Sequence, residues 1–337
     1  MSKNETSARL SVAPMMDWTD RHCRYFHRTM SRRVRLYTEM VTAAALIRGG
    51  AVHLLDHDPF EHPVALQLGG SDPDELAAAT KLAHETGYKE VNLNVGCPSD
   101  RVQSGCFGAV LMERPELVAE CVAAMAEAAP LHVSVKCRIG VDDQRPEDSL
   151  PSFVDKVASA GVSRFIIHAR KAWLKGLSPK ENREIPPLDY GLVRSIKRDF
   201  PHLFIEINGG ITSLDAVREH LGEGFDGVMV GRAAYHTPTD ILMRADTRIF
   251  SADSDPLDRP HDAALAMLDY IETHCSCGGR LHSVTRHMLG LFAGKPGARH
   301  WRRILSQEAH KDGAGPEVVE KALMAVPEVH GALSATA

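Results

Sequence analysis

The chain has 337 residues, of which 44% are hydrophobic and 25% are charged, and its formal net charge is −5 at pH 7. This length and composition suffice for a large hydrophobic core, in one large domain followed by a small one. No apolar run approaches the ~18 residues that a membrane span needs, and the start MSKNETSARL lacks the apolar core of a signal peptide. The seven cysteines are irregularly spaced, which predicts a reduced cytoplasmic protein without a disulfide framework or a metal site.

Short apolar or β-branched segments recur along the chain and are predicted to be strands, at 9–15, 34–40, 63–69, 90–96, 131–138, 164–170, 203–209 and 226–232. Amphipathic segments between them are predicted to be helices, most clearly at 72–87, 115–129, 189–200 and 213–221. Several of these helices begin after Asp or Ser and end before Gly, as capping favours. Eight strand–helix units in about 250 residues predict a (β/α)8 TIM barrel, and a doubly wound parallel sheet is the alternative.

After the last predicted strand, the segment FSADSDPLDRPHD (250–262) is rich in Asp, Pro and Ser and reads as a linker. The part that follows has helical periodicity without a convincing strand. We therefore predict a disordered N-terminus (1–8), a barrel (9–250), a linker (251–260), a small all-α domain (261–327) and a C-terminal tail (328–337).

The predicted helical domain contains a segment without acidic residues. Between Glu272 and Glu308 there is no Asp or Glu, whereas six Lys and Arg residues occur there, including Arg299 and Arg302. A cationic face on an acidic body suits the docking of a polyanion. The alternative is an ordinary solvated helix face.

Polar or glycine residues stand at most of the predicted strand ends. TIM-barrel enzymes take their catalytic residues from these ends and from the loops that follow. The residues there are Pro14, Met15, Met16, Gln67, Asn94, Lys136, His168, Asn208, Gly209, Gly210, Gly231 and Arg232. The last five fall after strands seven and eight, where barrels bind phosphate.

Each of these strand-end residues also has an ordinary explanation. The glycines could simply end a strand, and His168 could be a satisfied core histidine. Lys136 could be a snorkelling side chain, a Schiff-base lysine or a charge that faces an electron-rich cofactor. Their convergence at one end of the barrel is what predicts a site.

Cys97 stands between Gly96 and Pro98, at the head of the loop SDRVQSGCFG (99–108). A structural buried cysteine usually lies within an apolar segment, as Cys121 does. A thiol at the end of a strand, beside a glycine-containing loop, can act as a nucleophile or as a proton donor. The residues alone leave both roles open.

Several of these stretches resemble the tRNA-dihydrouridine synthases, flavin enzymes with an N-terminal barrel and a C-terminal helical domain. The resemblance extends from about residue 9 to 306, and it is clearest in APMMDWTD (13–20), NLNVGCPSDRVQSGCFGAVLM (92–112), VKCRIG (135–140), IHAR (167–170), INGGIT (207–212) and MVGRA (229–233). Two further stretches are similar to the A-type subfamily, namely GLSPKENREIPPL (176–188) and RHMLGLFAGKPGARHWRR (286–303).

The resemblance implies that FMN is bound by Pro14, Met15, Met16, Gln67, Lys136, His168, Asn208, Gly209, Gly210, Gly231 and Arg232. NADPH would reduce this flavin, hydride would pass from flavin N5 to uracil C6, and Cys97 would give C5 its proton. The substrate would be uridine at positions 20 and 20a in the D-loop of tRNA. The tRNA-binding candidates are Asn94, Lys180, Arg183, Arg299 and Arg302, and we expect a monomer with no stable protein partner.

Three other hypotheses stay open at this point. The first is an FMN barrel oxidoreductase that acts on a free pyrimidine or enone, which leaves the basic helical segment unexplained. The second is a flavin-free lyase or aldolase that uses Lys136. The third is an RNA-binding protein without catalytic activity.

Overall fold

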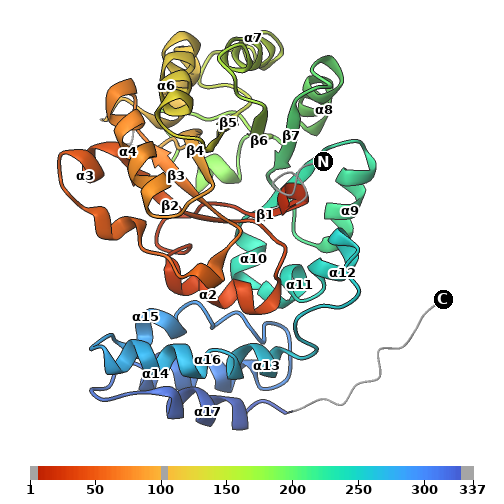
Figure 1. Ribbon diagram of the computed structural model, residues 1–337. Helices are drawn as coiled ribbons and strands as arrows, with labels where there is room; N and C mark the ends of the chain where they lie inside the picture. The colour runs from red at the N-terminus through yellow and green to blue at the C-terminus, as the bar shows by residue number, and fades with distance from the viewer. Residues whose placement is uncertain (1–6, 100–104, 328–337) are drawn as a thin grey trace.

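The structure, a computed structural model, describes residues 7–99 and 105–327 (Figure 1). Its eight parallel strands form one sheet in the order β1-β8-β7-β6-β5-β4-β3-β2. A backbone bridge between Ser11 and Arg35 joins the first strand to the start of the second, so the sheet closes on itself. Closure confirms the predicted TIM barrel and excludes the doubly wound alternative, whose sheet has two open edges.

Each predicted strand segment overlaps one observed strand. The strands are β1 (Leu10–Val12), β2 (Leu36–Thr42), β3 (Val64–Gly69), β4 (Glu90–Val95), β5 (His132–Arg138), β6 (Arg164–His168), β7 (Phe204–Asn208) and β8 (Gly227–Val230).

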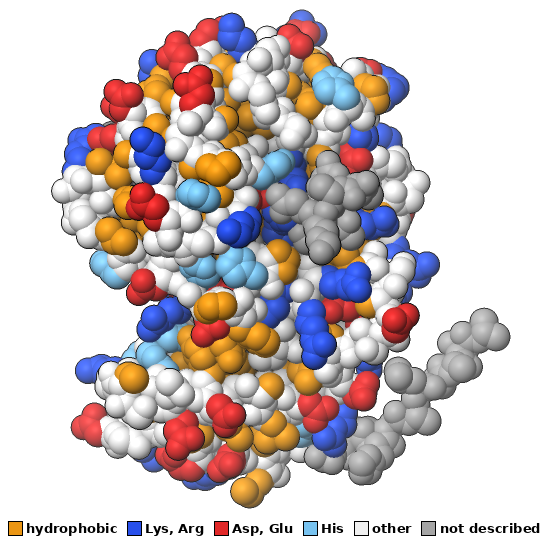
Figure 2. Space-filling view, in the orientation of Figure 1, with side chains coloured by type: hydrophobic (Ala, Val, Ile, Leu, Met, Phe, Trp, Pro, Cys, Tyr) orange, Lys and Arg blue, Asp and Glu red, His pale blue; other side chains and the backbone are white. Residues whose placement is uncertain are grey.

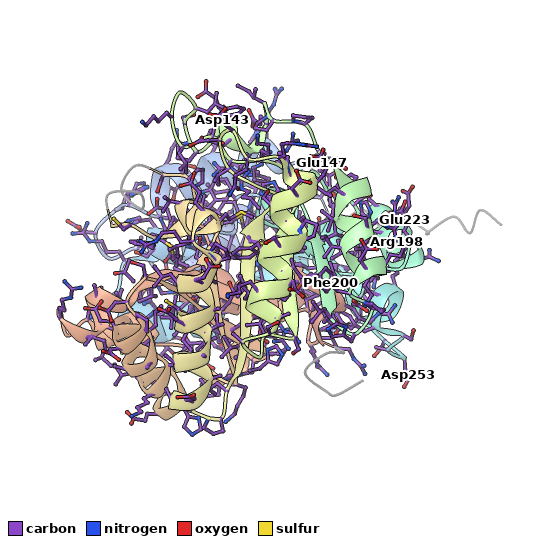
Figure 3. All side chains as sticks on the ribbon, turned by 90° about the horizontal axis from the view of Figure 1, so that it is seen from above. Asp143, Glu147, Arg198, Phe200, Glu223 and Asp253 are labelled. Carbon is purple, nitrogen blue, oxygen red and sulfur yellow. The ribbon has the colours of Figure 1, made fainter. Side chains whose placement is uncertain are left out.

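The predicted helices are also present, and their caps explain where they begin. Asp72 accepts a hydrogen bond from the backbone N–H of Glu75 at 3.0 Å, and Ser213 accepts one from Ala216 at 3.2 Å. The helices around the barrel are α2 (Arg21–Met30), α3 (Ala43–Ile47), α4 (Pro73–Glu85), α6 (Pro115–Ala128), α7 (Pro146–Ala158), α8 (Tyr190–Asp199), α9 (Leu214–Gly222), α10 (Arg232–His236), α11 (Pro238–Leu242) and α12 (Ala245–Phe250). Figure 3 shows Arg198 and Glu223 outside the strands, at this ring of helices.

The barrel wall has an apolar outer face and a largely polar inner one. In β4, Val91, Leu93 and Val95 belong to the main hydrophobic core between strands and helices. A second, much smaller apolar cluster contains Ala13, Tyr37, Ala65, Ile166 and Met229. The alternation of side chains along a strand sends every second residue into the barrel. Most of the buried charged and amide residues of β4 to β7 occupy these alternate positions, among them Glu90, Asn92, Asn94, Arg164, Glu206 and Asn208.

A second group of helices follows the barrel and packs beneath it in Figure 1. These helices are α13 (Pro260–Leu265), α14 (Leu268–Ser276), α15 (Leu281–Thr285), α16 (Ala298–Glu308) and α17 (Pro316–Met324). Helices α13 and α15 contact α2 of the barrel. The division into two domains stays a prediction, although residues 251–259 of the predicted linker contain neither a helix nor a strand, and α13 begins at its last residue, Pro260.

Close backbone approach also joins the helical part to the barrel. A side chain at Gly290 would bring its Cβ within 2.5 Å of the backbone oxygen of His236, at the end of α10. Asp20, which caps α2, accepts hydrogen bonds from Arg286 at 2.7 Å and from His287 at 3.0 Å. These contacts tie the helical part to the elements that follow β1 and β8.

Two parts of the predicted organisation lie largely or wholly outside the described residues, namely the disordered N-terminus (1–8) and the C-terminal tail (328–337). Within the described residues, every helix is too short or too polar to cross a bilayer. The same residues contain no group of three or more His, Cys, Asp and Glu side chains that could hold a metal ion.

Candidate active site

Strand pairing and side-chain hydrogen bonds together bring the predicted strand-end residues of the central strands to one level of the barrel, where Lys136 of β5 bonds Asn208 of β7. Asn94 lies opposite Lys136, and His168 lies opposite Asn208 in the parallel register. Gln67 reaches the same level because its side-chain oxygen accepts a hydrogen bond from Asn94 at 2.9 Å. The structure therefore gathers these five predicted site residues at the mouth formed by the carboxyl ends of the strands.

Lys136 of β5 is held by a side chain of β7, which lies two strands away in the sheet. Its Nζ donates to Oδ1 of Asn208 at 3.1 Å, and the amide of Asn208 in turn donates to the carbonyl of Met229 at 2.8 Å. Burial first, and the nearby charge of Arg138 second, lower the pKa of Lys136 from 10.5 to about 8, although Cys137 and Glu206 act in the opposite direction. The ammonium is therefore costly to maintain in the free protein, and an anionic ligand would relieve that cost.

His168 is buried beside the same cations, Arg138 and Lys136. No hydrogen bond joins either of its ring nitrogens to the described residues, and its side chain is 8% exposed. Burial, followed by the charges of Arg138, Lys136 and Arg170, holds its pKa well below 6.5. At neutral pH the ring therefore offers one donor and one acceptor to a ligand.

Two glycines after β7 have backbones that only glycine adopts easily. Gly209 has φ of +114° and Gly210 has φ of +74°. A Cβ at Gly209 would lie 2.6 Å from the His168 ring, and a Cβ at Gly210 would lie 2.8 Å from the Tyr190 hydroxyl. The turn that follows β7 is therefore packed closely against His168, on the side of the barrel where phosphate is expected.

Cys97 lies just past β4 and is partly buried. Its backbone N–H donates to Oδ1 of Asn94 at 3.0 Å, and its carbonyl accepts from the N–H of Ala109 at 2.9 Å. The thiol donates to Ser99 at 3.5 Å. The backbone of residue 97 is thus fixed from both sides, while residues 100–104 of the predicted loop lie outside the described part of the chain.

Arg138 joins the backbone just before Cys97 to the loop that follows β6. Its guanidinium donates to the carbonyl of Gly96 at 3.2 Å and to that of Asn182 at 2.8 Å. Asn182 is fully buried, and its amide bonds the backbone of Trp173 through both the oxygen and the nitrogen. This loop therefore has a defined shape next to Cys97.

The loop that follows β6 also carries Lys180 and Arg183, which are both exposed in the short 3-10 region around Glu181–Arg183. Arg232 at the start of α10 pairs with Glu184 of the same loop at 2.5 Å. The predicted phosphate ligand Arg232 thus already has a carboxylate partner on Nη1, while the other N–H groups of its guanidinium could still reach a phosphate. Met16, predicted for the cofactor, is 53% exposed.

Some cations of the predicted basic segment are ion-paired, and others are exposed to solvent. Arg286 pairs with Asp20 across the contact with the barrel. Arg299 and Arg302 on α16 are exposed and make no ion pair with the described residues. They border a surface hollow with Lys295 and His300. Figure 2 shows a waist between the barrel and the C-terminal helices, with Lys and Arg side chains beside it.

Two groups of site-supporting residues were missed from the sequence. The first is the polar interior of the barrel, whose signal is the alternation of Glu90, Asn92 and Asn94 within the apolar strand EVNLNV. The second is Asn182, whose role in the loop after β6 leaves no pattern in the sequence. The first group acts through hydrogen bonds between strands, whereas the Asn182 amide bonds residues of its own loop.

A closed parallel barrel with a thiol and several cations at its C-terminal mouth belongs to the class of TIM-barrel proteins whose active site lies at that end. The barrel is similar to that of the old yellow enzyme homologue from Zymomonas mobilis, with a TM-score of 0.52 over 68% of this chain and 86% of that one. The identity is 11%, so this likeness concerns the fold alone.

The chain belongs to the dihydrouridine synthase (Dus) family, whose profile matches residues 11–327. This confirms the resemblance seen in the sequence. A tRNA-dihydrouridine(20/20a) synthase of Vibrio cholerae is 57% identical over 322 residues, which cover 95% of this chain and 97% of the relative. The enzymes of the same name from Salmonella typhimurium and Escherichia coli K12 are 58% and 57% identical, and the matches cover 95% and 96% of this chain and 96% and 92% of those relatives.

Proposed function

We propose that this protein reduces the C5–C6 double bond of uridine at positions 20 and 20a of the tRNA D-loop, with FMN as cofactor and NADPH as reductant. The observation that carries the proposal is the near-complete match to relatives named for this reaction. The partly buried thiol of Cys97 at the barrel mouth supports it. The alternative oxidoreductase that acts on a free pyrimidine would not need the exposed cations of α16.

The residues at the mouth fit a flavin mononucleotide. Gln67 uses one N–H and one oxygen lone pair within the barrel, which leaves one of each for the hydrogen-bonding edge of a flavin ring. Lys136 offers a positive charge for the pyrimidine side of the reduced ring. The His168 ring and the Gly209–Gly210 turn suit the phosphate, and Pro14, Met15, Met16, Gly231 and Arg232 complete the proposed site.

When bound and reduced, FMN supplies the hydride that adds to C6 of the uracil ring. The chain's own task is then to protonate C5, and Cys97 is the proposed acid. Its backbone is held by Asn94 and Ala109, so the thiol is presented from a fixed point. A general acid must be within hydrogen-bond reach of the atom that it protonates, and a fixed backbone meets this need at little entropic cost.

The target base has to leave its stack to enter such a site, which costs a few kcal/mol. Contacts elsewhere on the tRNA must offset this cost. We assign that role to the exposed Lys180 and Arg183 beside the mouth and to Arg299 and Arg302 on α16. We assign Asn94 to the uridine only through its remaining amide hydrogen, because its oxygen already accepts two backbone hydrogen bonds.

The decisive experiment compares substrates. Purified protein with NADPH is given tRNA that lacks dihydrouridine, and free uridine or UMP at equal uridine concentration. We expect dihydrouridine at positions 20 and 20a, mapped by mass spectrometry, and negligible turnover of the free nucleoside. Comparable efficiency on UMP would favour the free-pyrimidine alternative, and a colourless protein that releases no flavin on denaturation would favour the aldolase or lyase.

The exposed arginines of α16 give a separate prediction about binding. We expect Arg299→Ala or Arg302→Ala to weaken tRNA affinity about five- to tenfold, because each removes one phosphate contact, and to reduce the salt slope by about one. Flavin content should not change. Fluorescence anisotropy across a salt series measures both quantities.

Arg198→Ala is the matched control for this prediction, since Arg198 is an exposed helical arginine at the outside of the barrel that pairs with Asp199 (Figure 3). Its affinity for tRNA should equal that of the unaltered protein. Equal affinity in all three variants would mean that the basic segment is an ordinary solvated helix face without a role in tRNA binding.

A further inference from the structure

A chain of hydrogen bonds runs through the inside of the barrel toward its mouth. The end far from the mouth, called the lower end, is a carboxylate that is ion-paired. Glu90 of β4 contacts the guanidinium groups of Arg35 and Arg164, the second at 2.7 Å. Ser134 of β5 donates to Oε1 of Glu90 at 2.9 Å and accepts from the amide nitrogen of Asn92 at 2.9 Å. These five side chains are at most 2% exposed.

The chain continues upward to the candidate active site. Oδ1 of Asn92 accepts from Nε2 of Gln67 at 2.8 Å, and Oε1 of Gln67 accepts from Nδ2 of Asn94 at 2.9 Å. Oδ1 of Asn94 then accepts from the backbone N–H groups of Gly96 and Cys97, each at 3.0 Å. The chain therefore ends on the backbone that carries the candidate catalytic thiol.

Both ends of this chain permit only one direction of donation. The carboxylate of Glu90, paired with two guanidinium groups, can only accept, and the backbone N–H groups at the upper end can only donate. Every hydroxyl and amide between them must then donate downward and accept from above. Rotation of one amide by 180° would place donor against donor and acceptor against acceptor in a buried site, which is costly.

We propose that Ser134 and Asn92 are positioning residues that transmit this fixed direction from Glu90 to the amides of Gln67 and Asn94. The result is that Gln67 presents a defined donor and acceptor at the mouth and that the Cys97 backbone is held in one place. Neither Ser134 nor Asn92 is at the mouth, so they act through Gln67 and Asn94. The inference rests on the proposed function, because Gln67 and Cys97 are assigned there to cofactor and substrate.

The test removes one link and measures three quantities. In Ser134→Ala, the Asn92 amide loses its connection to Glu90. We expect faster alkylation of Cys97 by iodoacetamide in the flavin-free protein, a shifted midpoint potential of bound flavin, and a drop of about 10-fold in kcat for dihydrouridine formation with KM for tRNA unchanged. Alkylation of Cys106, which is exposed, should not change. Peptide mass mapping separates the two thiols.

Two further variants keep the test decisive. Ser134→Thr keeps the hydroxyl and should restore all three quantities, and Asn92→Ala breaks the chain one link higher and should reproduce the Ser134→Ala result. The control is Ser195→Ala, which removes a hydroxyl that bonds only Leu192 of its own helix, α8. It should leave all three quantities unchanged.

The proposal is overturned if folded Ser134→Ala and Asn92→Ala keep the alkylation rate and the flavin potential of the unaltered protein. It is equally overturned if Ser195→Ala shows the same changes, since that would indicate general loosening. Failure of the proposed function looks different: the unaltered protein would form no dihydrouridine, while the alkylation at Cys97 would still respond to Ser134→Ala and support the positioning role.

Discussion

Replacement of Cys97 by Ala is expected to slow dihydrouridine formation by about 10²- to 10⁴-fold, which is the usual contribution of a positioned general acid. Flavin content and the rate of flavin reduction by NADPH should stay within about twofold, because neither step needs the thiol. Rapid-mixing absorbance of the flavin separates its reduction from its reoxidation by tRNA. Only the reoxidation should slow.

The structure indicates that this substitution leaves the fold intact. Cys97 is partly buried, and within the described residues its thiol makes one weak hydrogen bond, to Ser99. The contacts that hold the segment come from its backbone, which Ala retains. The loss of stability should therefore be about 1 kcal/mol or less, well below what a cavity in the core costs.

Cys106 provides the control within the same loop, because it is an exposed cysteine. Its backbone is left-handed, and Ala is no more strained in that conformation than Cys. Cys106→Ala should keep near-normal turnover. Full turnover in Cys97→Ala would mean that another group is the acid. Loss of turnover in Cys106→Ala alone would move the assignment to that thiol.

The second large effect is expected at Lys136. In the flavin-free protein, Lys136→Met should raise the free energy of unfolding by about 1–2 kcal/mol at pH 7, because it removes an ammonium whose pKa is lowered from 10.5 to about 8. The lost hydrogen bond to Asn208 makes the gain smaller than the pKa shift alone would give.

The pH dependence of this gain has a definite sign. Below pH 8 the lysine is charged in both the folded and the unfolded chain, so its whole destabilising effect is present. Between pH 8 and 10.5 the folded chain binds fewer protons than the unfolded one, and the destabilising effect fades. The difference between the variant and the unaltered protein, measured by urea unfolding, should therefore shrink across this window. A difference that grows with pH would contradict the assignment.

The same substitution should also change the redox potential of the flavin when it is bound to the protein. A cation near the reduced flavin stabilises its negative charge, so Lys136→Met should lower the flavin midpoint potential by about 30–60 mV, which corresponds to about 1.4–3 kcal/mol for two electrons. Lys171→Met is the control, since Lys171 donates to the carbonyl of Gln144 at 2.8 Å rather than to a residue of the mouth. An unchanged potential in Lys136→Met would place this lysine outside the reach of the flavin.

Much of the architecture could be predicted from local pattern. The alternation of strand and helix segments predicted eight parallel strands, and the chain forms them within a few residues of the expected positions. Capping residues such as Asp72 and Ser213 predicted helix starts because their hydrogen bonds involve neighbours in the chain. Cys97 stood out for a similar reason, since its position between Gly96 and Pro98 is visible without tertiary structure.

Contacts between distant segments could not be predicted in this way. Arg286 lies in a segment without acidic residues, yet Asp20, 266 positions earlier, pairs with it. Arg232 was expected to await a phosphate, yet it pairs with Glu184 from a loop two strands away. Asn94 was expected to face the substrate, yet its oxygen holds the backbone of Cys97. In each case the partner belongs to another element, or to a turn whose shape the barrel imposes.

The sequence by itself determined the succession of strands and helices, the residues at the strand ends and the position of the thiol, because each depends on propensity, period or spacing along the chain. Only the tertiary structure decided the inside of the barrel. Glu90, Asn92 and Asn94 read as one polar face of a strand, which in an antiparallel sheet could face water. Closure of the sheet removes that water, so these residues must satisfy one another, and their direction of hydrogen bonding is set by groups that the chain brings from other strands.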